Sequence, residues 1–275
     1  MGFELGTLAR DAGYDLLAFD TVGSTNAEAL ARARVGVAGP VWVVTRHQTA
    51  GRGRRGRAWE TPEGNLAASL LVSVEADRPL AATLGFVAGL ALNQAIRTVA
   101  PNIAVAVGVD GLDEPRGPKL TLKWPNDVLA DGAKVAGILL EVDALADGRL
   151  AVVIGLGINV AAAPDGLPYA ATCLKRLGSD ATAEQLFTAL ADAWVGFHAI
   201  WDEGRGLSEI RRLWLAQAAG LGAPVAVRLG NDILRGTFET LDEDGRLIVL
   251  TADGARRTIA AGEVHFGAAA TAALQ

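Results

Sequence analysis

The sequence contains little of several residue types on which whole classes of protein depend. Cys173 is its only cysteine, so no disulfide can form within the chain. The most apolar stretch, residues 80–92, is too short to span a lipid bilayer. The chain also does not open with a basic segment followed by an apolar one, as a signal peptide does. We therefore expect a cytoplasmic protein without disulfides or membrane spans.

Basic residues are also in the minority. The chain has 25 Lys and Arg against 31 Asp and Glu, which gives a net charge of −6 and a pI near 5.2. An acidic chain is not expected to bind membrane surfaces or bulk DNA as its main partner. Aromatic residues make up only 5%, but a hydrophobic content of 51% is ample for a core. A length of 275 residues suits one large domain, alone or with a small module.

One loop departs from this acidic background. Residues 48–59, called the arginine loop below, read Gln-Thr-Ala-Gly-Arg-Gly-Arg-Arg-Gly-Arg-Ala-Trp and, with Arg46, carry five arginines and no acid. Its glycines let backbone N–H groups approach an oxyanion, and each guanidinium fits phosphate or carboxylate. Trp59 offers a flat face for a nucleobase. The loop predicts a bound nucleotide, and the ordinary alternative is a solvated turn.

Two common nucleotide motifs do not account for this loop. It contains a formal G-x-G-x-x-G, but the dinucleotide fingerprint requires a helix at the third glycine, whereas residues 66–74 here read as a strand. The chain has no G-x-x-x-x-G-K-[ST] phosphate loop. A single basic loop on an acidic chain is also a weak indication of nucleic-acid binding.

Apolar periodicity and turn residues predict alternating strands and helices up to about residue 218. The expected strands are 14–19, 41–45, 66–74, 103–109, 120–123, 128–130, 134–142 and 150–160, and the expected helices are 27–33, 80–99, 183–201 and 207–218. From residue 223, four short strands separated by turns predict a small antiparallel barrel. These strands are 224–229, 233–241, 247–250 and 256–260. Residues 268–275 are expected to be a frayed tail, and we assign no function to the stretch 108–119.

Taken in order, five motifs of this chain resemble those of the biotin protein ligases. The motifs are Gly23-Ser24-Thr25-Asn26, residues 48–57 followed by Trp59, Lys123-Trp124-Pro125-Asn126-Asp127, Lys134-Val135-Ala136-Gly137-Ile138-Leu139-Leu140-Glu141 and Gly155-Leu156-Gly157-Ile158-Asn159. Their order and approximate spacing match that family from about residue 14 to residue 160. The arginine loop followed by K-W-P-N-D and K-x-x-G-I-L-x-E is the most specific part of the resemblance.

The resemblance implies an α+β fold, in which a mixed β-sheet is flanked by helices as in the class II aminoacyl-tRNA synthetase core. A small C-terminal SH3-like β-barrel follows. We expect a catalytic domain over residues 1–219, the barrel over 220–267 and the tail over 268–275. The first motif begins at residue 23, which leaves no room for the N-terminal winged-helix repressor domain of some members, so the ligase-only form is expected, as a monomer or weak homodimer.

The resemblance also implies a two-step reaction. The carboxylate of biotin attacks the α-phosphate of ATP to give biotinyl-5′-adenylate and pyrophosphate. A lysine of a biotin carboxyl carrier domain then attacks this anhydride and releases AMP. Biotin and ATP are the implied substrates, Mg²⁺ the implied metal and the carrier domain the implied partner, with no permanently bound cofactor.

The family motifs place the site residues as follows. The expected catalytic residues are Lys134 and Arg54; the biotin-binding residues are Ser24, Thr25, Asn26, Gln48, Gly51, Arg52, Gly53, Arg54, Lys134, Gly137 and Gly155; and the ATP-binding residues are Arg52, Arg54, Arg55, Arg57, Trp59, Asn126, Lys134 and Asn159. Asn126 and Asp127 are expected to position Mg²⁺, directly or through water. Ordinary structural explanations remain open at several of these positions. They are a helix cap at Ser24 and Thr25, strand bulges at Gly137 and Gly155, an exposed Lys134, a core Trp59 and a turn acid at Asp127.

Three alternative functions also remain open. A lipoate or octanoate ligase shares the implied fold but lacks this doubled-arginine loop. A non-catalytic biotin or nucleotide sensor is a second alternative, and a nucleic-acid-binding module is the third. The arginine loop has few apolar anchors, and fixing the backbone costs roughly 1–2 kcal/mol per residue. We therefore expect the loop to be mobile without ligand and to close when biotin or the adenylate binds.

Overall fold

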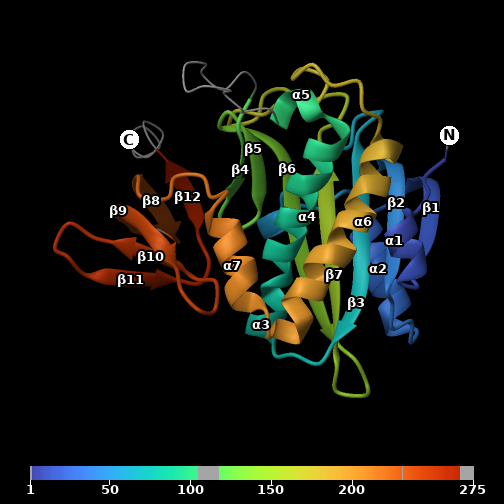
Figure 1. The fold of residues 1–275 in the computed structure, drawn as a ribbon, viewed down its shortest axis with the longest axis horizontal. Coiled ribbons are helices and arrows are strands. Elements are labelled where there is room, and N and C mark those ends of the chain that lie inside the picture. Colours follow the sequence, from blue (N-terminus) through green and yellow to red (C-terminus); the bar gives the residue numbers. More distant parts are fainter. Residues whose placement is uncertain (1, 105–117, 231, 267–275) are drawn as a thin grey trace, which may run out of the picture.

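The computed structural model describes residues 2–104, 118–230 and 232–266, and its centre is a seven-stranded mixed β-sheet (Figure 1). The strands lie in the order β1-β2-β3-β7-β6-β5-β4. β1 and β2 are parallel, and every other neighbouring pair is antiparallel. The strand bounds are β1 Asp15–Val22, β2 Val41–Gln48, β3 Leu66–Val74, β4 Leu120–Lys123, β5 Asp127–Ala130, β6 Ala133–Ala144 and β7 Leu150–Ile158.

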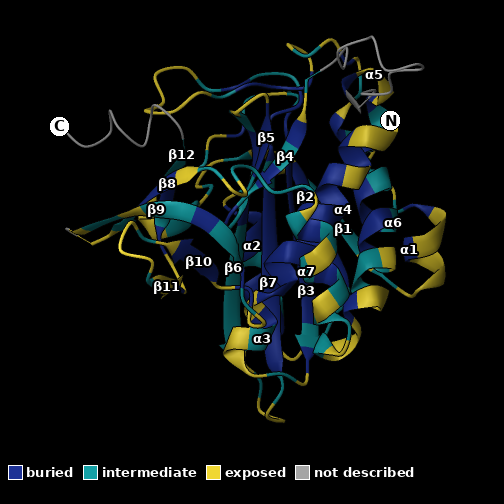
Figure 2. Ribbon diagram, turned by 60° about the vertical axis from the view of Figure 1, so that its left-hand side comes forward, coloured by how far each residue is buried: buried dark blue, intermediate teal, exposed yellow. Residues whose placement is uncertain are grey.

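Helices cover both faces of this sheet, as the α+β class predicts (Figure 1). On one face α4 and α6 lie side by side along the strands, and on the other α2 packs Ala29, Leu30 and Ala33 against β2, β3 and β7. Figure 2 shows that buried residues concentrate in the strands and in the sheet-facing sides of the helices. The helix bounds are α1 Thr7–Asp11, α2 Thr25–Arg34, α3 Arg78–Ala82, α4 Leu84–Val99, α5 Pro101–Ala104, α6 Ala183–Trp201 and α7 Leu207–Leu215.

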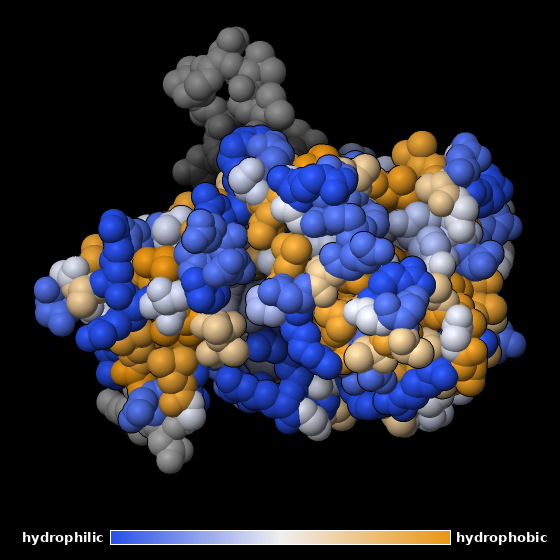
Figure 3. Space-filling model, turned by 90° about the horizontal axis from the view of Figure 1, so that it is seen from below, coloured by the Kyte–Doolittle hydropathy of each residue, from blue (hydrophilic) through white to orange (hydrophobic). Residues whose placement is uncertain are grey.

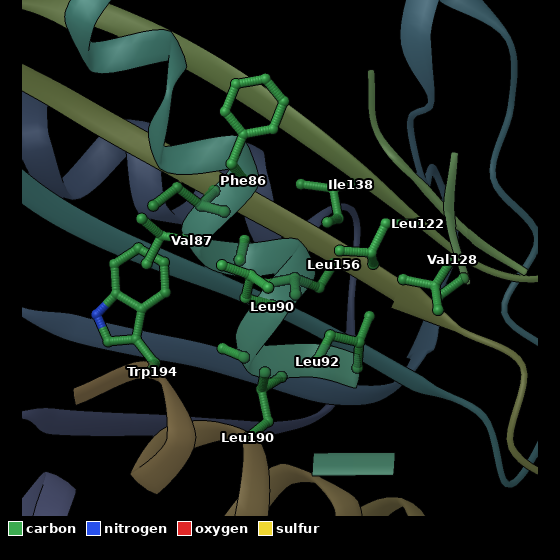
Figure 4. Close-up of a cluster of buried hydrophobic side chains, with 14 of the residues drawn as sticks. Phe86, Val87, Leu90, Leu92, Leu122, Val128, Ile138, Leu156, Leu190 and Trp194 are labelled. Carbon is green, nitrogen blue, oxygen red and sulfur yellow. The ribbon is translucent and has the colours of Figure 1, made fainter. Parts of the chain in front are cut away.

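The main core lies between the sheet and the α4–α6 layer (Figure 4). Leu90 and Leu92 of α4 and Leu190 and Trp194 of α6 meet the strand residues Leu122, Val128, Ile138 and Leu156 there. Within the described residues, one helical segment is long and apolar enough to cross a membrane. It is Arg78–Val99, 22 residues long, which contains the apolar stretch 80–92 and extends beyond it at both ends. Of its most apolar window, 78% is buried inside the protein, as befits a core helix.

The C-terminal part forms a separate five-stranded antiparallel sheet. Its strands are β8 Pro224–Leu229, β9 Asp232–Leu241, β10 Leu247–Leu250, β11 Arg256–Ile259 and β12 Glu263–Phe266, in the order β11-β10-β9-β8-β12. The four expected strands are present. β12 was not expected, because four residues, Glu-Val-His-Phe, carry too little pattern for a sequence signal. Over the described residues β11 and β12 are the two edges of this sheet.

Two further expectations about secondary structure need correction. Ile103 and Ala104 lie in α5 rather than in a strand, and the rest of the strand expected at 103–109 lies outside the described residues, as do most of the stretch 108–119 and the tail 268–275. The helix expected over 80–99 is two helices, divided at Thr83. The Thr83 hydroxyl donates to the carbonyl of Leu80 and accepts a hydrogen bond from Nε1 of Trp201, so this residue serves tertiary packing as well.

An aromatic stack on α6 holds a half-buried titratable group. His198 lies between Trp194 and Trp201, with ring centroids 5.3 and 5.8 Å away and rings nearly parallel to both. Its Nε2 is buried without a hydrogen-bond partner among the described residues. Burial lowers the pKa of His198 below its ordinary value of 6.5, because the ring loses the hydration that stabilises its charged form.

This stack predicts an acid-sensitive contribution to stability. Below about pH 6.5 the unfolded chain binds a proton at His198 that the folded chain resists, so the free energy of unfolding falls as the pH drops toward the lowered folded pKa. His198→Phe keeps an aromatic ring and removes this proton. In urea unfolding at about pH 7.5 and about pH 5.5, we expect the variant to lose less stability on acidification than the wild type. The exposed His47→Asn serves as the control, and an unchanged pH dependence in His198→Phe would contradict the assignment.

Candidate active site

One large cleft, with a volume of about 910 Å³, lies between the central sheet and the C-terminal sheet. Its walls come from the N-terminus of α2, the arginine loop, strands β4 to β7, residues 168–170 and β12. Figure 3, seen from below Figure 1, shows the C-terminal lobe projecting from the main body, with a hollow between them that is rimmed by hydrophilic side chains. Segments far apart in the sequence therefore share one concave surface.

The N-terminus of α2 and the end of β2 form one end of this cleft. Ser24 caps α2, since its Oγ accepts a hydrogen bond from the backbone N–H of Ala27. The backbone N–H and the hydroxyl of Thr25 lie 2.9 and 3.2 Å from Oε1 of Gln48, and Nε2 of Gln48 donates to Thr61. The cap alternative at Ser24 is therefore correct, and Thr25 and Gln48 also hold each other beside the cleft.

The arginine loop is a tight hairpin folded over the cleft. Arg52 and Ala58 form an antiparallel bridge, and the backbone N–H of Trp59 donates to the carbonyl of Gly51. A Cβ on Gly51 would lie 2.2 Å from the backbone oxygen of Trp59, so only glycine fits there. Arg55 has a φ of 57°, an uncommon conformation for a residue with a side chain. At this turn the neighbouring arginines point in different directions.

Arg54 points into the cleft. Its Nη1 donates to Oδ1 of Asn126 at 2.9 Å, and Nδ2 of Asn126 donates to the carbonyl of Ile138, which fixes the orientation of the amide. Burial lowers the pKa of Arg54, and the charge of Arg55 lowers it further, against the opposing charges of Asp127 and Glu263. Arg54 is therefore a partly desolvated cation, which interacts more strongly with an anion than an exposed arginine does.

Arg55 and Arg57 instead reach Glu263 on β12. Their Nη1 atoms lie 3.3 and 3.2 Å from its two carboxylate oxygens. Partial burial raises the pKa of Glu263, but the hydrogen bond from Arg57 and the positive charges of Arg57, His265 and Arg55 outweigh it, so the net pKa lies below 4.5. The C-terminal sheet thus supplies the carboxylate that holds the outer side of the arginine loop.

Lys134 occupies the middle of the cleft. Its Nζ lies 2.8 Å from Oδ1 of Asp127 and sits over the rings of Trp59 and Tyr169, 5.5 and 5.4 Å from their centroids. The backbone N–H of Lys134 donates to the carbonyl of Ala170, which fastens the segment carrying Tyr169. Lys134 is therefore not an exposed hairpin lysine, which was the alternative explanation. Asp127 is the counter-ion of Lys134 and not merely a turn residue.

Strand glycines make room for the protein's own side chains. A Cβ on Gly157 would lie 2.2 Å from the indole of Trp59, and one on Gly137, the cross-strand partner of Gly157, would lie 3.2 Å from that ring. Trp59 therefore lies flat on β6 and β7 rather than in the main core. Asn26 lies over Gly155 in the same way: a Cβ on Gly155 would be 2.1 Å from Oδ1 of Asn26. Gly137 and Gly155 were expected to make room for ligand, and much of that space holds these side chains.

Most of the expected site residues line this cleft. They are Ser24, Thr25, Asn26, Gln48, Arg52, Gly53, Arg54, Arg55, Arg57, Trp59, Asn126, Asp127, Lys134, Gly137 and Gly155. Two expected residues do not. Gly51 shapes the hairpin from behind, as described above. Asn159 is 2% exposed, and its Nδ2 donates to the carbonyl of Thr172, so it secures the segment after β7 and not a surface of the cleft.

Several residues of the site carried no assigned role in the sequence. Lys123 lines the cleft, and burial lowers its pKa, opposed by the charge of Asp127 and reinforced by that of Lys134. Lys123 and Glu141 lie inside the recognised motifs and could have been found there. Tyr169 and Glu263 lie in segments without a motif, and only the structure brings them to the cleft.

The expected magnesium ligands are engaged by the protein's own cations. Oδ1 of Asn126 accepts from Arg54, and Oδ1 of Asp127 pairs with Lys134. Across the described residues, no group of three or more His, Cys, Asp or Glu side chains is placed to hold a metal ion. The assignment of these two residues to Mg²⁺, directly or through water, stays a prediction, because Mg²⁺ at nucleotide sites is held by one or two carboxylates together with substrate phosphates and waters.

Comparison with known proteins gives a consistent result. Residues 24–159 match the family model described as the biotin/lipoate A/B protein ligase family, and residues 220–267 match the biotin protein ligase C-terminal domain. The chain is 41% identical over 250 residues to the biotin–[acetyl-CoA-carboxylase] ligase of Paracoccus denitrificans, covering 89% of this chain and 97% of the relative. It is 37% identical to the enzyme of the same name from Mycobacterium tuberculosis, covering 88% and 85%.

Solved structures agree with the sequence relatives. The biotin protein ligase from Aquifex aeolicus in complex with biotin and ATP superposes with a TM-score of 0.72 at 26% identity, covering 92% of this chain and 99% of that one. This agreement confirms the expected mixed sheet with flanking helices. On these grounds the chain belongs to the biotin/lipoate A/B protein ligase family.

Proposed function

We propose that this protein is an ATP-dependent biotin protein ligase that biotinylates a lysine of a biotin carboxyl carrier domain. The observation that carries the proposal is the placement of Lys134, whose ammonium lies between Trp59 and Tyr169 and beside Asp127, in the same cleft as Arg54. A carboxylate and a phosphate brought together here would meet two partly desolvated cations. Such preorganised charge lowers the barrier to a reaction between two anions.

The proposed reaction has two steps. A carboxylate oxygen of biotin forms a bond to the α-phosphorus of ATP, and the bond from that phosphorus to the bridging oxygen breaks to release pyrophosphate. The amine of the carrier lysine then bonds to the acyl carbon of the adenylate, gives up a proton, and displaces AMP. In this proposal Lys134 and Arg54 stabilise the negative charge that accumulates on phosphate and carboxylate in the first step.

The two ends of the cleft suit the two substrates. The biotin end has neutral hydrogen-bonding groups on Ser24, Thr25, Asn26 and Gln48, which suit a ureido ring, and Arg52, Gly53 and the strand glycines border it. The nucleotide end has Arg54, Arg55, Arg57 and the indole of Trp59. Asn126 holds Arg54 there, and Gly51 and Asn159 support the site without lining it. The magnesium ion would enter with the ATP phosphates, and no step is assigned to it.

The division of the chain is part of the same proposal. The catalytic domain would comprise residues 1–219 and the C-terminal domain residues 220–267, which lie on either side of the cleft. A cytoplasmic location suits a reaction that consumes ATP and modifies a carboxylase. The carrier lysine would enter the cleft only in the second step.

The first test is biotin-dependent exchange between ATP and pyrophosphate. With purified protein and Mg²⁺, we expect exchange with biotin and none with lipoate or octanoate. The reason is that the biotin end is lined by hydrogen-bonding groups, whereas a fatty-acyl chain needs an apolar channel. Exchange with lipoate or octanoate instead would move the protein to the other branch of the family. Exchange with no acid would leave a sensing role.

Arg54→Gly should weaken retention of the adenylate. The change removes both the cation and the hydrogen bond that ties the loop to Asn126, so the loop should open and the anhydride should escape. The measurement is biotinylation of bystander lysines, for example on albumin, which we expect to rise while carrier labelling falls. Arg149→Gly, at an exposed arginine of the β6–β7 hairpin, is the matched control. If both proteins label albumin equally, the assigned role of Arg54 is incorrect.

Glu263→Gln should weaken ATP binding more than biotin binding. The neutral amide no longer pairs with Arg55 and Arg57, and exposed ion pairs of this kind are worth about 0.2–1 kcal/mol, so the KM for ATP should rise about two- to fivefold. The pKa of Glu263 in the folded protein is lowered. In the wild type, its ion pairs with Arg55 and Arg57 are therefore fully present above about pH 4.5, and they are lost as the pH falls through the lowered folded pKa. Glu239→Gln, which breaks an exposed pair with Arg256 in the same sheet, is the control. Equal KM values for ATP in the two variants would argue against the link.

A further inference from the structure

A chain of hydrogen bonds runs under the biotin end of the cleft and centres on Asn26. Nδ2 of Asn26 donates to Oε2 of Glu141 on β6 at 2.8 Å, and Oγ of Ser69 on β3 lies 2.6 Å from Oδ1 of Asn26. Ser69 is 0% exposed and Asn26 is 4% exposed. A buried amide with both ends bonded has a single orientation.

The sheet register explains how one side chain reaches both partners. Ser69 on β3 lies opposite Gly155 on β7, and Gly155 lies opposite Leu139 on β6, two residues before Glu141 and on the same face. The partners are thus two strand spacings apart, roughly 10 Å. The Asn26 carboxamide bridges this gap over Gly155, where a Cβ would lie 2.1 Å from Oδ1. Glycine at 155 leaves the room that the amide needs.

The direction of each hydrogen bond follows from donor and acceptor chemistry. The carboxylate of Glu141 can only accept, so Nδ2 of Asn26 faces it and Oδ1 faces Ser69. Oδ1 can only accept, so the single hydroxyl proton of Ser69 goes to it. Oγ of Ser69 also lies 2.7 Å from Oγ1 of Thr25, whose own proton has two acceptors within reach, Ser69 and Oε1 of Gln48. The two hydrogen bonds of the Asn26 amide have fixed directions in either case.

We propose that Ser69 and Glu141 are positioning residues for ligand recognition, which hold the Asn26 carboxamide so that its second Nδ2–H donates to an acceptor oxygen of biotin. This inference rests on the proposed function. The second Nδ2 proton has no partner among the residues that the structure describes, and Asn26 lines the cleft. Neither Ser69 nor Glu141 lines the cleft. They act through Asn26.

Glu141 also connects this amide to the arginine loop. Its Oε1 lies 3.9 Å from Nη1 of Arg52, while its Oε2 accepts from Asn26. One carboxylate therefore touches the biotin end through one oxygen and the arginine loop through the other. Substitutions at Glu141 can separate the two contacts, because glutamine keeps an acceptor oxygen for Asn26 and loses the charge that attracts Arg52.

Steady-state ATP–pyrophosphate exchange on the whole protein tests the proposal. We expect Ser69→Ala and Glu141→Ala to raise the KM for biotin about tenfold or more, because a hydrogen bond that orients a buried amide is lost. Gly155→Ala should do the same without removing any bonding partner, since its methyl group displaces the amide. Glu141→Gln should recover most of the biotin KM. In all four variants the KM for ATP should stay within about twofold of the wild type, which a general loss of structure would not allow.

Matched controls lie on the same strands. Ser73→Ala on β3 removes a hydroxyl that donates to the carbonyl of Ala38, and Asp143→Asn on β6 breaks an exposed pair with Arg34. Both should leave the KM for biotin unchanged. The proposal is overturned if the Ser69, Glu141 and Gly155 variants keep the wild-type KM for biotin, or if the KM for ATP rises in parallel. A wild-type protein without biotin-dependent exchange would instead overturn the proposed function.

Side-chain amide NMR gives a second readout that needs no activity. In the free protein the Nδ2 protons of Asn26, identified by their loss in Asn26→Asp, should exchange slowly with solvent because one is bonded to Glu141 and the group is buried. Exchange should be faster in Glu141→Ala than in Glu141→Gln. Equal exchange in both variants and in the wild type would show that Glu141 does not hold the amide.

Discussion

Repulsion between cations is the constraint on which the cleft depends. Two unit charges 4 Å apart in a medium with an effective dielectric constant near 20 interact by about 4 kcal/mol, so a cluster of arginines and lysines cannot be gathered without compensation. Three carboxylates supply it, each from a different strand. Glu141 on β6 faces Arg52, Asp127 on β5 faces Lys134, and Glu263 on β12 faces Arg55 and Arg57. If any one of these carboxylates were removed, the cation that it faces would have no counter-charge unless an anionic ligand were bound.

The floor of the cleft depends on glycines in β6 and β7. Gly157 and its cross-strand partner Gly137 seat the indole of Trp59, and Gly155 seats the carboxamide of Asn26. Because residues two apart on a strand face the same side, Gly155 and Gly157 place an amide and an aromatic ring next to each other on one surface. A polar amide and an aromatic ring are thus both seated on a single strand.

Strands and helices with a regular apolar pattern, and site residues that lie within motifs, could be predicted from the sequence. The strands at 66–74, 120–123 and 224–229 have the bounds that their apolar pattern predicts, as does the helix at 183–201. The arginine loop and Lys134 come together as the motifs imply. Cross-chain contacts could not be predicted in this way. Glu263 meets the arginine loop from more than two hundred residues away, on a strand too short to carry a pattern. Arg54 and Arg55 reach different partners, Asn126 and Glu263, at a turn where Arg55 has a positive φ. Asn159 was expected to contact ATP. The sequence shows only a polar residue after an apolar run and does not show that its side chain donates to the carbonyl of Thr172.

The outer side of the arginine loop is held through charged groups, and its ion pairs with Glu263 and Glu141 are partly exposed to water. The sheet below it is held by fully buried apolar side chains such as Trp42, Leu70 and Ile154. Dissolved salt acts on these two parts very differently. At about 1 M ionic strength charges are screened over roughly 3 Å, so the loop loosens while the core keeps its packing. Ionic strength therefore weakens the ion pairs on the outer side of the loop while the apolar core keeps its packing.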